Sequence, residues 1–155
     1  MKSKLFEFKM VLYPFPLLVS KDFDWKEIED NFYYVTGENT CEEFNESLKP
    51  IATRCAHTAE VVNKETGMMY YMTLIYEVDM ATVGTFAHEA GHISTFLGHR
   101  LGFQERNFTN DEPYAYIDQF VADCIDSVMK DEPKRMDGRL FKLKKSGTAP
   151  EEKKE

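Results

Sequence analysis

Two histidines and a glutamate near the middle of the chain have a spacing that suits metal chemistry. His88-Glu89-Ala90-Gly91-His92 is an HExxH pattern. Residues four apart on a helix lie on one face, so His88 and His92 can present two imidazole nitrogens to one metal ion. Glu89 would lie on the flank, where a carboxylate can take a proton from metal-bound water without completing the ligand set. The pattern predicts a zinc-dependent hydrolytic site with Glu89 as its base.

The residues around this pattern predict a helix that ends near residue 102 and turns the two histidines away from its apolar side. A stripe with a period near 3.6 is formed by Val83, Phe86, Ala90, Ile93, Leu97 and Leu101. His88 and His92 lie nearly opposite it, whereas histidines buried only for packing would lie on it. We therefore expect the imidazoles to face a cleft. Gly84, Gly91 and Gly98 recur along one flank and predict a smooth groove for another element.

A third ligand is expected from outside the pattern, because catalytic zinc usually has three protein ligands and one water. His99 shares the helical face of His92, but seven residues of helix span about 10 Å, too far for bonds near 2 Å. Glu112 is the better candidate, since it starts the next predicted helix, at about 113–130, after a loop long enough to fold back. The alternative is that Glu112 is only a helix-start acid, with Thr109 completing a capping box.

The HExxH segment and the segment that follows it resemble those of gluzincin-type zincin metallopeptidases. Residues 84–92 and 111–117 also look like those of small HExxH proteins encoded by bacteriophages and prophages, and the similarity in organisation covers about residues 51–130. The resemblance implies a metallopeptidase-like fold, with Zn²⁺ held by His88, His92 and Glu112 and with Glu89 as the catalytic acid/base.

The sequence departs from the larger gluzincins at Tyr116. Those enzymes often have an aspartate four residues after the glutamate ligand, where it orients a histidine. Tyr116 could instead hydrogen-bond a ligand or stabilise an oxyanion as a catalytic residue, and packing in the core is the alternative. Asp111 and Asp118 are further candidates for orienting a ligand.

The rest of the chain predicts an α+β fold: a small antiparallel sheet, the HExxH helix packed on it, and a second helix that carries a ligand, as in a minimal zincin. We expect an extended segment at about 5–19, a helix at 22–34, a short helix at 41–48, and a hairpin of strands at 51–62 and 68–78. The resemblance to zincins implies that strand 68–78 offers a sheet edge to which an extended peptide can add, and packing of residues 68–72 in the core is the alternative. Cys55 and His57 share a strand face, where a thiol nucleophile pair is an alternative to simple packing.

Length, charge and cysteine content limit the class of protein. The 155 residues suit a single domain, which we expect at 1–145. We expect residues 146–155 to form a disordered charged tail. A net charge of −8 argues against nucleic acid, and no apolar run is long enough to cross a membrane. Three cysteines without CxxC spacing favour a reducing cytoplasm. We interpret the basic stretch at 134–145 as a solvated tail, with a membrane or partner contact as the alternative.

These observations together predict a zinc metallopeptidase that acts on a peptide or protein substrate. One alternative is a metal-containing binding protein without activity, for example a phage-encoded inhibitor of a host factor. Another is a structural protein without metal. The substrate, the oligomeric state and the native metal stay open at this point.

Overall fold

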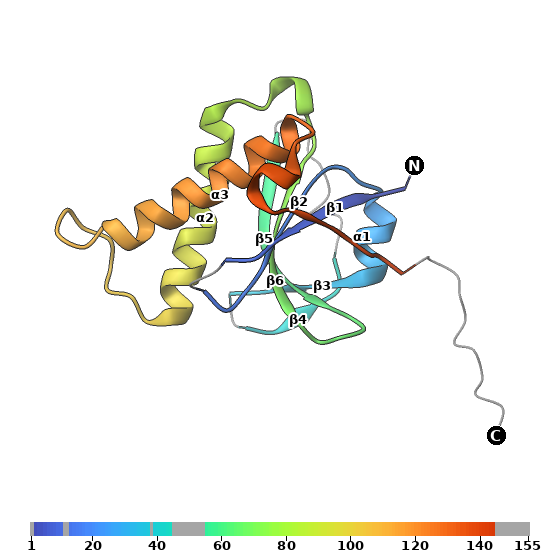
Figure 1. Cartoon of the computed structure of the whole chain (residues 1–155). Helices are drawn as coiled ribbons and strands as arrows, with labels where there is room; N and C mark the ends of the chain where they lie inside the picture. The colour runs from blue at the N-terminus through green and yellow to red at the C-terminus, as the bar shows by residue number, and fades with distance from the viewer. Residues whose placement is uncertain (1, 11–12, 38, 45–54, 145–155) are drawn as a thin grey trace.

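The computed structural model describes residues 2–10, 13–37, 39–44 and 55–144, and it has an α+β architecture (Figure 1). The strands are β1 Lys4–Phe8, β2 Leu17–Asp22, β3 Phe32–Val35, β4 Cys41–Glu42, β5 Ala56–Asn63, β6 Met69–Ile75 and β7 Arg139–Phe141. The helices are α1 Trp25–Asn31, α2 Val83–Leu101 and α3 Glu112–Met129, with short 3-10 turns η2 Val78–Met80 and η3 Pro133–Met136. The predicted fold class is confirmed, although the seven-stranded sheet is larger than expected.

The strand order places the hairpin in the interior of the sheet. Neighbouring strands follow the order β4-β3-β5-β6-β2-β1-β7, and β6 pairs with β5 on one side and with β2 on the other. The β2–β6 pair is parallel, and the other pairs are antiparallel. The prediction that strand 68–78 offers a free edge to a peptide is therefore wrong, because a strand from much earlier in the chain occupies that edge.

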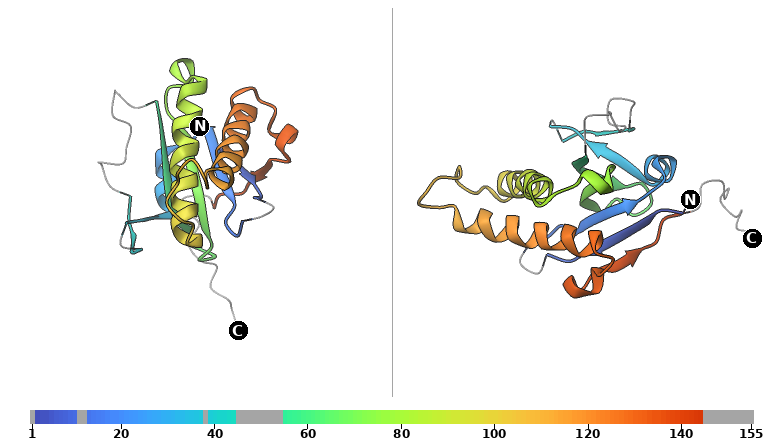
Figure 2. Two further views of the ribbon diagram at one scale, coloured as in Figure 1. Left: turned by 90° about the vertical axis from the view of Figure 1, so that its left-hand side faces the viewer. Right: turned by 90° about the horizontal axis from the view of Figure 1, so that it is seen from above.

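Two apolar clusters lie on opposite faces of the sheet. On one face, Tyr71 and Ile75 of β6 pack in the cluster that includes the buried sides of α2 and α3. On the other face, Tyr70 and Met72 pack with Ile28 of α1. The alternation follows from the two-residue period of a strand. In Figure 2, α2 and α3 accordingly lie together on one side of the sheet, and α1 lies on the other.

Helix α1 is shorter than its sequence pattern indicates. Asp24 caps it by accepting hydrogen bonds from the backbone N–H groups of Lys26 and Glu27, and the helix ends at Asn31. Phe32 then starts β3 and lies opposite Asn63 of β5. Aromatic residues at helical spacing predict a helix to residue 34, but the same residues also suit a half-buried strand. Pairing with β5 decides in favour of the strand.

The segment expected to form a short helix at 41–48 starts as a strand. Cys41 and Glu42 form β4, which pairs with Val35 and Tyr34 of β3. Residues 45–48 of that prediction lie outside the described residues. The polar composition of this segment gave no periodic signal, so only strand pairing identifies β4.

The predicted hairpin is confirmed as β5 and β6 over the described residues, and residues 51–54 of its first predicted strand lie outside them. Its turn follows from local chemistry. The Asn63 side-chain oxygen accepts hydrogen bonds from the backbone N–H groups of Glu65 and Thr66, at 3.0 Å in both cases. Gly67 has φ of 70°, a left-handed conformation that glycine adopts without steric cost. These contacts set the register in which β5 and β6 run under α2.

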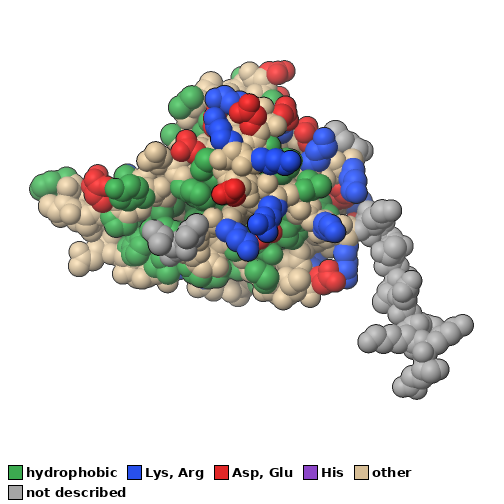
Figure 3. All heavy atoms as spheres, in the orientation of Figure 1, with side chains coloured by type: hydrophobic (Ala, Val, Ile, Leu, Met, Phe, Trp, Pro, Cys, Tyr) green, Lys and Arg blue, Asp and Glu red, His purple; other side chains and the backbone are tan. Residues whose placement is uncertain are grey.

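The basic stretch near the C-terminus is in part a strand and not a solvated tail. Arg139, Leu140 and Phe141 form β7, which pairs with Leu5, Phe6 and Glu7 of β1. On the face shown in Figure 3, Lys and Arg side chains gather over β7 and the end of α3. The predicted tail at 146–155 lies outside the described residues. Within the described part of the chain, no helix has the length and apolar character needed to cross a membrane.

Candidate metal centre

Helix α2 carries the HExxH pattern near its middle, and local signals define both of its ends. Thr82 and Thr85 form a reciprocal capping box, in which each side-chain oxygen accepts from the other residue's backbone N–H. Gly102 ends the helix with φ of 68°. The predicted apolar stripe is buried at Phe86, Ala90, Ile93 and Leu97, whereas Val83 and Leu101 are exposed at the helix ends.

His88 and His92 lie on the exposed face of α2, and their ring nitrogens converge. The two Nε2 atoms are 3.1 Å apart, and the rings are nearly perpendicular at 87°. Two zinc–nitrogen bonds of about 2.1 Å at a tetrahedral angle would separate the nitrogens by roughly 3.4 Å. The pair therefore fits two corners of a tetrahedral metal site with little adjustment. A hydrogen bond between a protonated and an unprotonated imidazole would produce a similar distance.

Phe96 connects the His92 imidazole to the sheet. Its ring stacks on His92 at 6.2 Å between centroids and on Tyr71 of β6 at 6.3 Å. Burial raises the pKa of the Tyr71 phenol well above its ordinary value, the Glu60 carboxylate raises it further, and Arg100 lowers it. Tyr71 is consequently a neutral support beneath the site and does not titrate near neutral pH.

Glu89 has a different environment from the two histidines beside it. Its side chain is only 4% exposed and is turned toward β5, where the Thr58 hydroxyl donates a hydrogen bond to Oε2 at 2.5 Å. The Thr58 hydroxyl also lies 2.9 Å from that of Thr73 on β6. The carboxylate is thus held between the helix and the sheet, on the flank of the imidazole pair.

The structure does not bring Glu112 to the two imidazoles. Among the residues that it describes, no three His, Cys, Asp or Glu side chains gather into a group able to hold a metal ion. Glu112 is exposed in the first turn of α3, and that turn lies against the end of α2 because Tyr114 contacts Gly98. Gly98 follows His92 by six residues, about 9 Å along a helix axis.

The structure also shows where the other candidate residues near the start of α3 lie, namely those expected to orient a ligand or stabilise an oxyanion. Asp111 is the N-cap residue but makes no side-chain capping bond, so the capping box expected from Thr109 does not form. Asp118 pairs with Arg106 at 2.8 Å. Tyr116 is 67% exposed, so packing in the core does not explain it.

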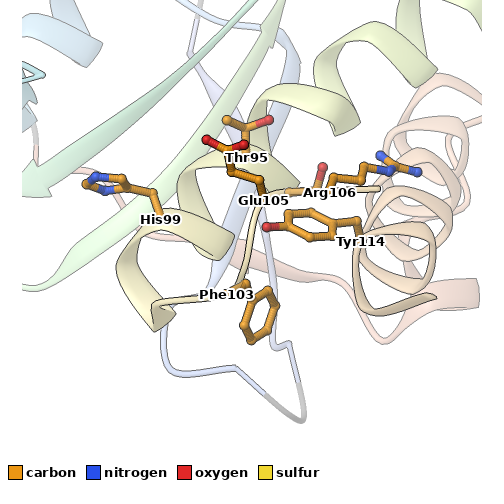
Figure 4. A pocket seen from close by; sticks show the side chains of 7 residues that line it. Thr95, His99, Phe103, Glu105, Arg106 and Tyr114 are labelled. Atoms are coloured by element: carbon orange, nitrogen blue, oxygen red, sulfur yellow. The ribbon is translucent and has the colours of Figure 1, made fainter. Parts of the chain in front are cut away.

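The hollow in Figure 4 lies beside the C-terminal part of α2 and has a volume of about 270 Å³. Ser94, Thr95, His99, Phe103, Glu105, Arg106 and Tyr114 line it. The imidazole of His99 and the ring of Tyr114 lie on opposite sides of the helix in this view. His88 and His92 are not among its lining residues, so the hollow is not part of the candidate metal centre.

The expected glycine groove forms at one of its three positions. A Cβ atom at Gly98 would lie 2.6 Å from Cε1 of Tyr114, so α3 approaches the helix backbone closely there. At Gly91 a Cβ atom would meet nothing within 4 Å, and at Gly84 it would meet only Thr82 Oγ1 at 3.4 Å. Of the three glycines, only Gly98, in the last turns of α2, is approached closely by α3.

The cysteines are spread over separate elements. Cys55 lies just before β5 and His57 lies within it, and both are half-buried. Cys124 is buried in α3, and burial raises the pKa of its thiol well above the ordinary value. Because the thiolate is the reactive form, Cys124 is a packing residue and not a nucleophile.

Thr58 and Thr73 are site residues that no sequence motif identifies. Threonine is common in strands, and neither residue belongs to a recognisable motif. Thr73 interrupts the apolar stretch of β6, which is a usable signal, whereas Thr58 stands between His57 and Ala59 in a mixed segment that offers none. Comparison of the chain with protein-family models, curated proteins and solved structures finds no match.

Proposed function

We propose that the protein is a zinc-dependent peptidase whose metal is held by His88 and His92, with Glu89 as the general base. The observation that supports this most directly is the 3.1 Å separation of the two Nε2 atoms on an exposed helix face. An exposed pair leaves room for a water molecule and for a peptide. We propose a cytoplasmic peptide or protein substrate, in line with the sparse and unpatterned cysteines.

When bound, zinc would supply a Lewis acid that polarises the scissile carbonyl and makes water acidic enough to attack near neutral pH. In the proposed reaction, Glu89 accepts one proton from the attacking water while the oxygen bonds to the carbonyl carbon. Glu89 then delivers that proton to the amide nitrogen as the carbon–nitrogen bond breaks. The products are a carboxylic acid and an amine, and the base returns to its starting state.

Glu112 is the proposed third ligand, and Tyr116 a proposed oxyanion donor one turn later. Both side chains are exposed at the start of α3, so solvent reaches them. For Glu112 to act as a ligand, the first turn of α3 must lie nearer His92 than it does when Tyr114 packs on Gly98. Zinc content of Glu112→Gln protein is the direct measure of this role.

A second function, a metal-containing binding protein without activity, is favoured by the burial of Glu89. A carboxylate that is 4% exposed and bonded to Thr58 is placed well for holding α2 on the sheet. The two functions differ in one outcome. A peptidase loses turnover in Glu89→Gln protein, whereas a binding protein has no turnover to lose.

The first experiment is elemental analysis of the purified chain, with His99→Ala as the control for a histidine on the same helix face. We expect one zinc per wild-type, His99→Ala and Glu89→Gln chain, and a loss of most of the zinc from His88→Ala and His92→Ala chains. Zinc-loaded protein is then incubated with a tryptic peptide library, and new termini are detected by mass spectrometry. We expect cleavage by wild-type protein and not by Glu89→Gln or chelator-treated protein.

Two results would contradict the proposal at different points. Equal zinc content in wild-type and His92→Ala chains would show that His92 does not hold the metal, which contradicts the proposed site. Stoichiometric zinc in a wild-type chain that cleaves nothing, while holding a partner protein uncut, would favour the binding function.

A further inference from the structure

Two threonines face each other across the central strands of the sheet, directly under the HExxH helix. Thr58 of β5 and Thr73 of β6 are register partners in the antiparallel hairpin, and their hydroxyl oxygens are 2.9 Å apart. Their exposures are 6% and 0%. Thr58 is the point at which this buried pair reaches α2, through its 2.5 Å bond to Glu89 Oε2.

We propose that Thr58, supported by Thr73, is the positioning residue that orients the Glu89 carboxylate for proton transfer. The inference rests on the proposed function, since it assigns Thr58 a role through Glu89. The Thr58 bond engages Oε2 and leaves Oε1 as the oxygen that takes the proton. A carboxylate on a three-bond side chain has many orientations, and one fixed bond to a central strand removes most of them.

Proton counting sets the direction of the two hydrogen bonds. An ionised carboxylate only accepts, and a threonine hydroxyl has one proton. Thr58 uses its proton on Glu89, so the contact between the hydroxyls has Thr73 as donor and Thr58 as acceptor. Bonds that run in one direction polarise each other, which strengthens the bond to the carboxylate. Thr73 therefore acts on Glu89 only through Thr58.

The location of the pair explains how it can hold a carboxylate in place. β5 and β6 are interior strands, each hydrogen-bonded to a neighbour on both sides. A second contact fixes α2 to the same strand face, because Arg100 pairs with Glu60, two residues beyond Thr58. The distance from the Thr58 hydroxyl to the helix is thus set by the sheet, and the position of the Glu89 head group follows from it.

The test compares Thr58→Val, which keeps the shape and removes the hydroxyl, with Thr58→Ser, which keeps the hydroxyl. Ser127→Ala is the matched control, since Ser127 is fully buried and its hydroxyl donates to the Cys124 carbonyl, away from Glu89. The substrate is the library peptide that wild-type protein cleaves fastest, resynthesised. We expect kcat to fall about 10- to 100-fold in Thr58→Val, with KM and zinc content near wild type. We expect Thr58→Ser to restore most of kcat, and Ser127→Ala to leave it unchanged.

A second readout does not need activity. In metal-free protein, Thr58→Val should lower the folding equilibrium constant about tenfold or more, because it leaves a buried carboxylate without its donor. In a Glu89→Met background the same substitution should have little effect, because the acceptor is gone. Urea unfolding of the four proteins measures this coupling.

The outcomes separate the inference from the proposed function. Full kcat in Thr58→Val, with Glu89→Gln inactive, overturns the positioning role alone. Equal effects of Thr58→Val and Thr58→Ser also overturn it, because the hydroxyl would then not be the active feature. A zinc-loaded wild-type chain that cleaves nothing overturns the proposed function and the role built on it, even where the folding measurements show coupling.

Discussion

The packing of Tyr114 against Gly98 provides a sharp test of how α3 is placed beside the candidate site. A Cβ atom at Gly98 would lie 2.6 Å from Cε1 and 2.8 Å from Oη of Tyr114, closer than real contacts. The ring is not free to move aside, because its hydroxyl donates to the Gln104 carbonyl at 2.8 Å and its edge packs on Phe103. We therefore expect Gly98→Ala to destabilise the protein by overpacking.

The magnitude follows from three contributions. Alanine in place of glycine within a helix stabilises it by about 1 kcal/mol. Overpacking costs about 1–3 kcal/mol, and displacing the Tyr114 hydroxyl from Gln104 costs about 1 kcal/mol more. The net loss should be about 1–3 kcal/mol. Gly91→Ala is the control on the same helix, and it should stabilise by up to about 1 kcal/mol because nothing lies within 4 Å of the added Cβ.

Urea unfolding followed by circular dichroism measures both effects, and thermal unfolding provides a second reading. At about 2–4 °C per kcal/mol for a chain of this size, Gly98→Ala should lower the melting temperature by several degrees. In a Tyr114→Ala background, Gly98→Ala should no longer destabilise. The reasoning would be refuted if Gly98→Ala and Gly91→Ala were equally stable, because the start of α3 would then not lie against Gly98.

Two further predictions concern stability away from the site. Thr82→Ala removes half of the capping box of α2 and should cost about 1 kcal/mol in urea unfolding; an unchanged midpoint would show that the box does not hold the helix start. The pKa of Asp126 is lowered chiefly by its hydrogen bond from Arg135 and next by that from Lys130. Its folded pKa is therefore below the unfolded value near 3.9, so its contribution is complete above about pH 5 and disappears as the pH falls through the folded pKa. Asp126→Asn should be less stable than wild type at pH 7 and equal to it in strong acid; a difference that persisted there would contradict the ion-pair origin.

Several features of the molecule could be predicted from residues close together in the chain. Helical periodicity and the i, i+4 spacing were enough to put His88 and His92 on one exposed face, because a helix turns by a constant angle per residue. The turn at Asn63 and Gly67 likewise follows from side-chain and backbone chemistry within a few residues. Local signals of this kind identify elements and faces.

Other features depend on contacts between distant segments. The insertion of β2 beside β6 closed the edge that a peptide was expected to use, and pairing with β1 turned a basic tail segment into β7. Neither pairing has a local sequence signal, because the order of strands in a sheet depends on how the faces of the complete sheet pack. Local pattern alone therefore predicted the strands of the hairpin but not their neighbours.

The candidate site also combines features that nearby residues predict with features that only tertiary packing determines. The position of Glu89 on α2 follows from the sequence, but its burial against Thr58 depends on how α2 packs on β5. The distance of Glu112 from the imidazoles depends on where α3 crosses α2, which the contact of Tyr114 with Gly98 sets. A helix fixes the spacing of its own side chains through its backbone hydrogen bonds, whereas the separation of two helices is set only when their side chains pack.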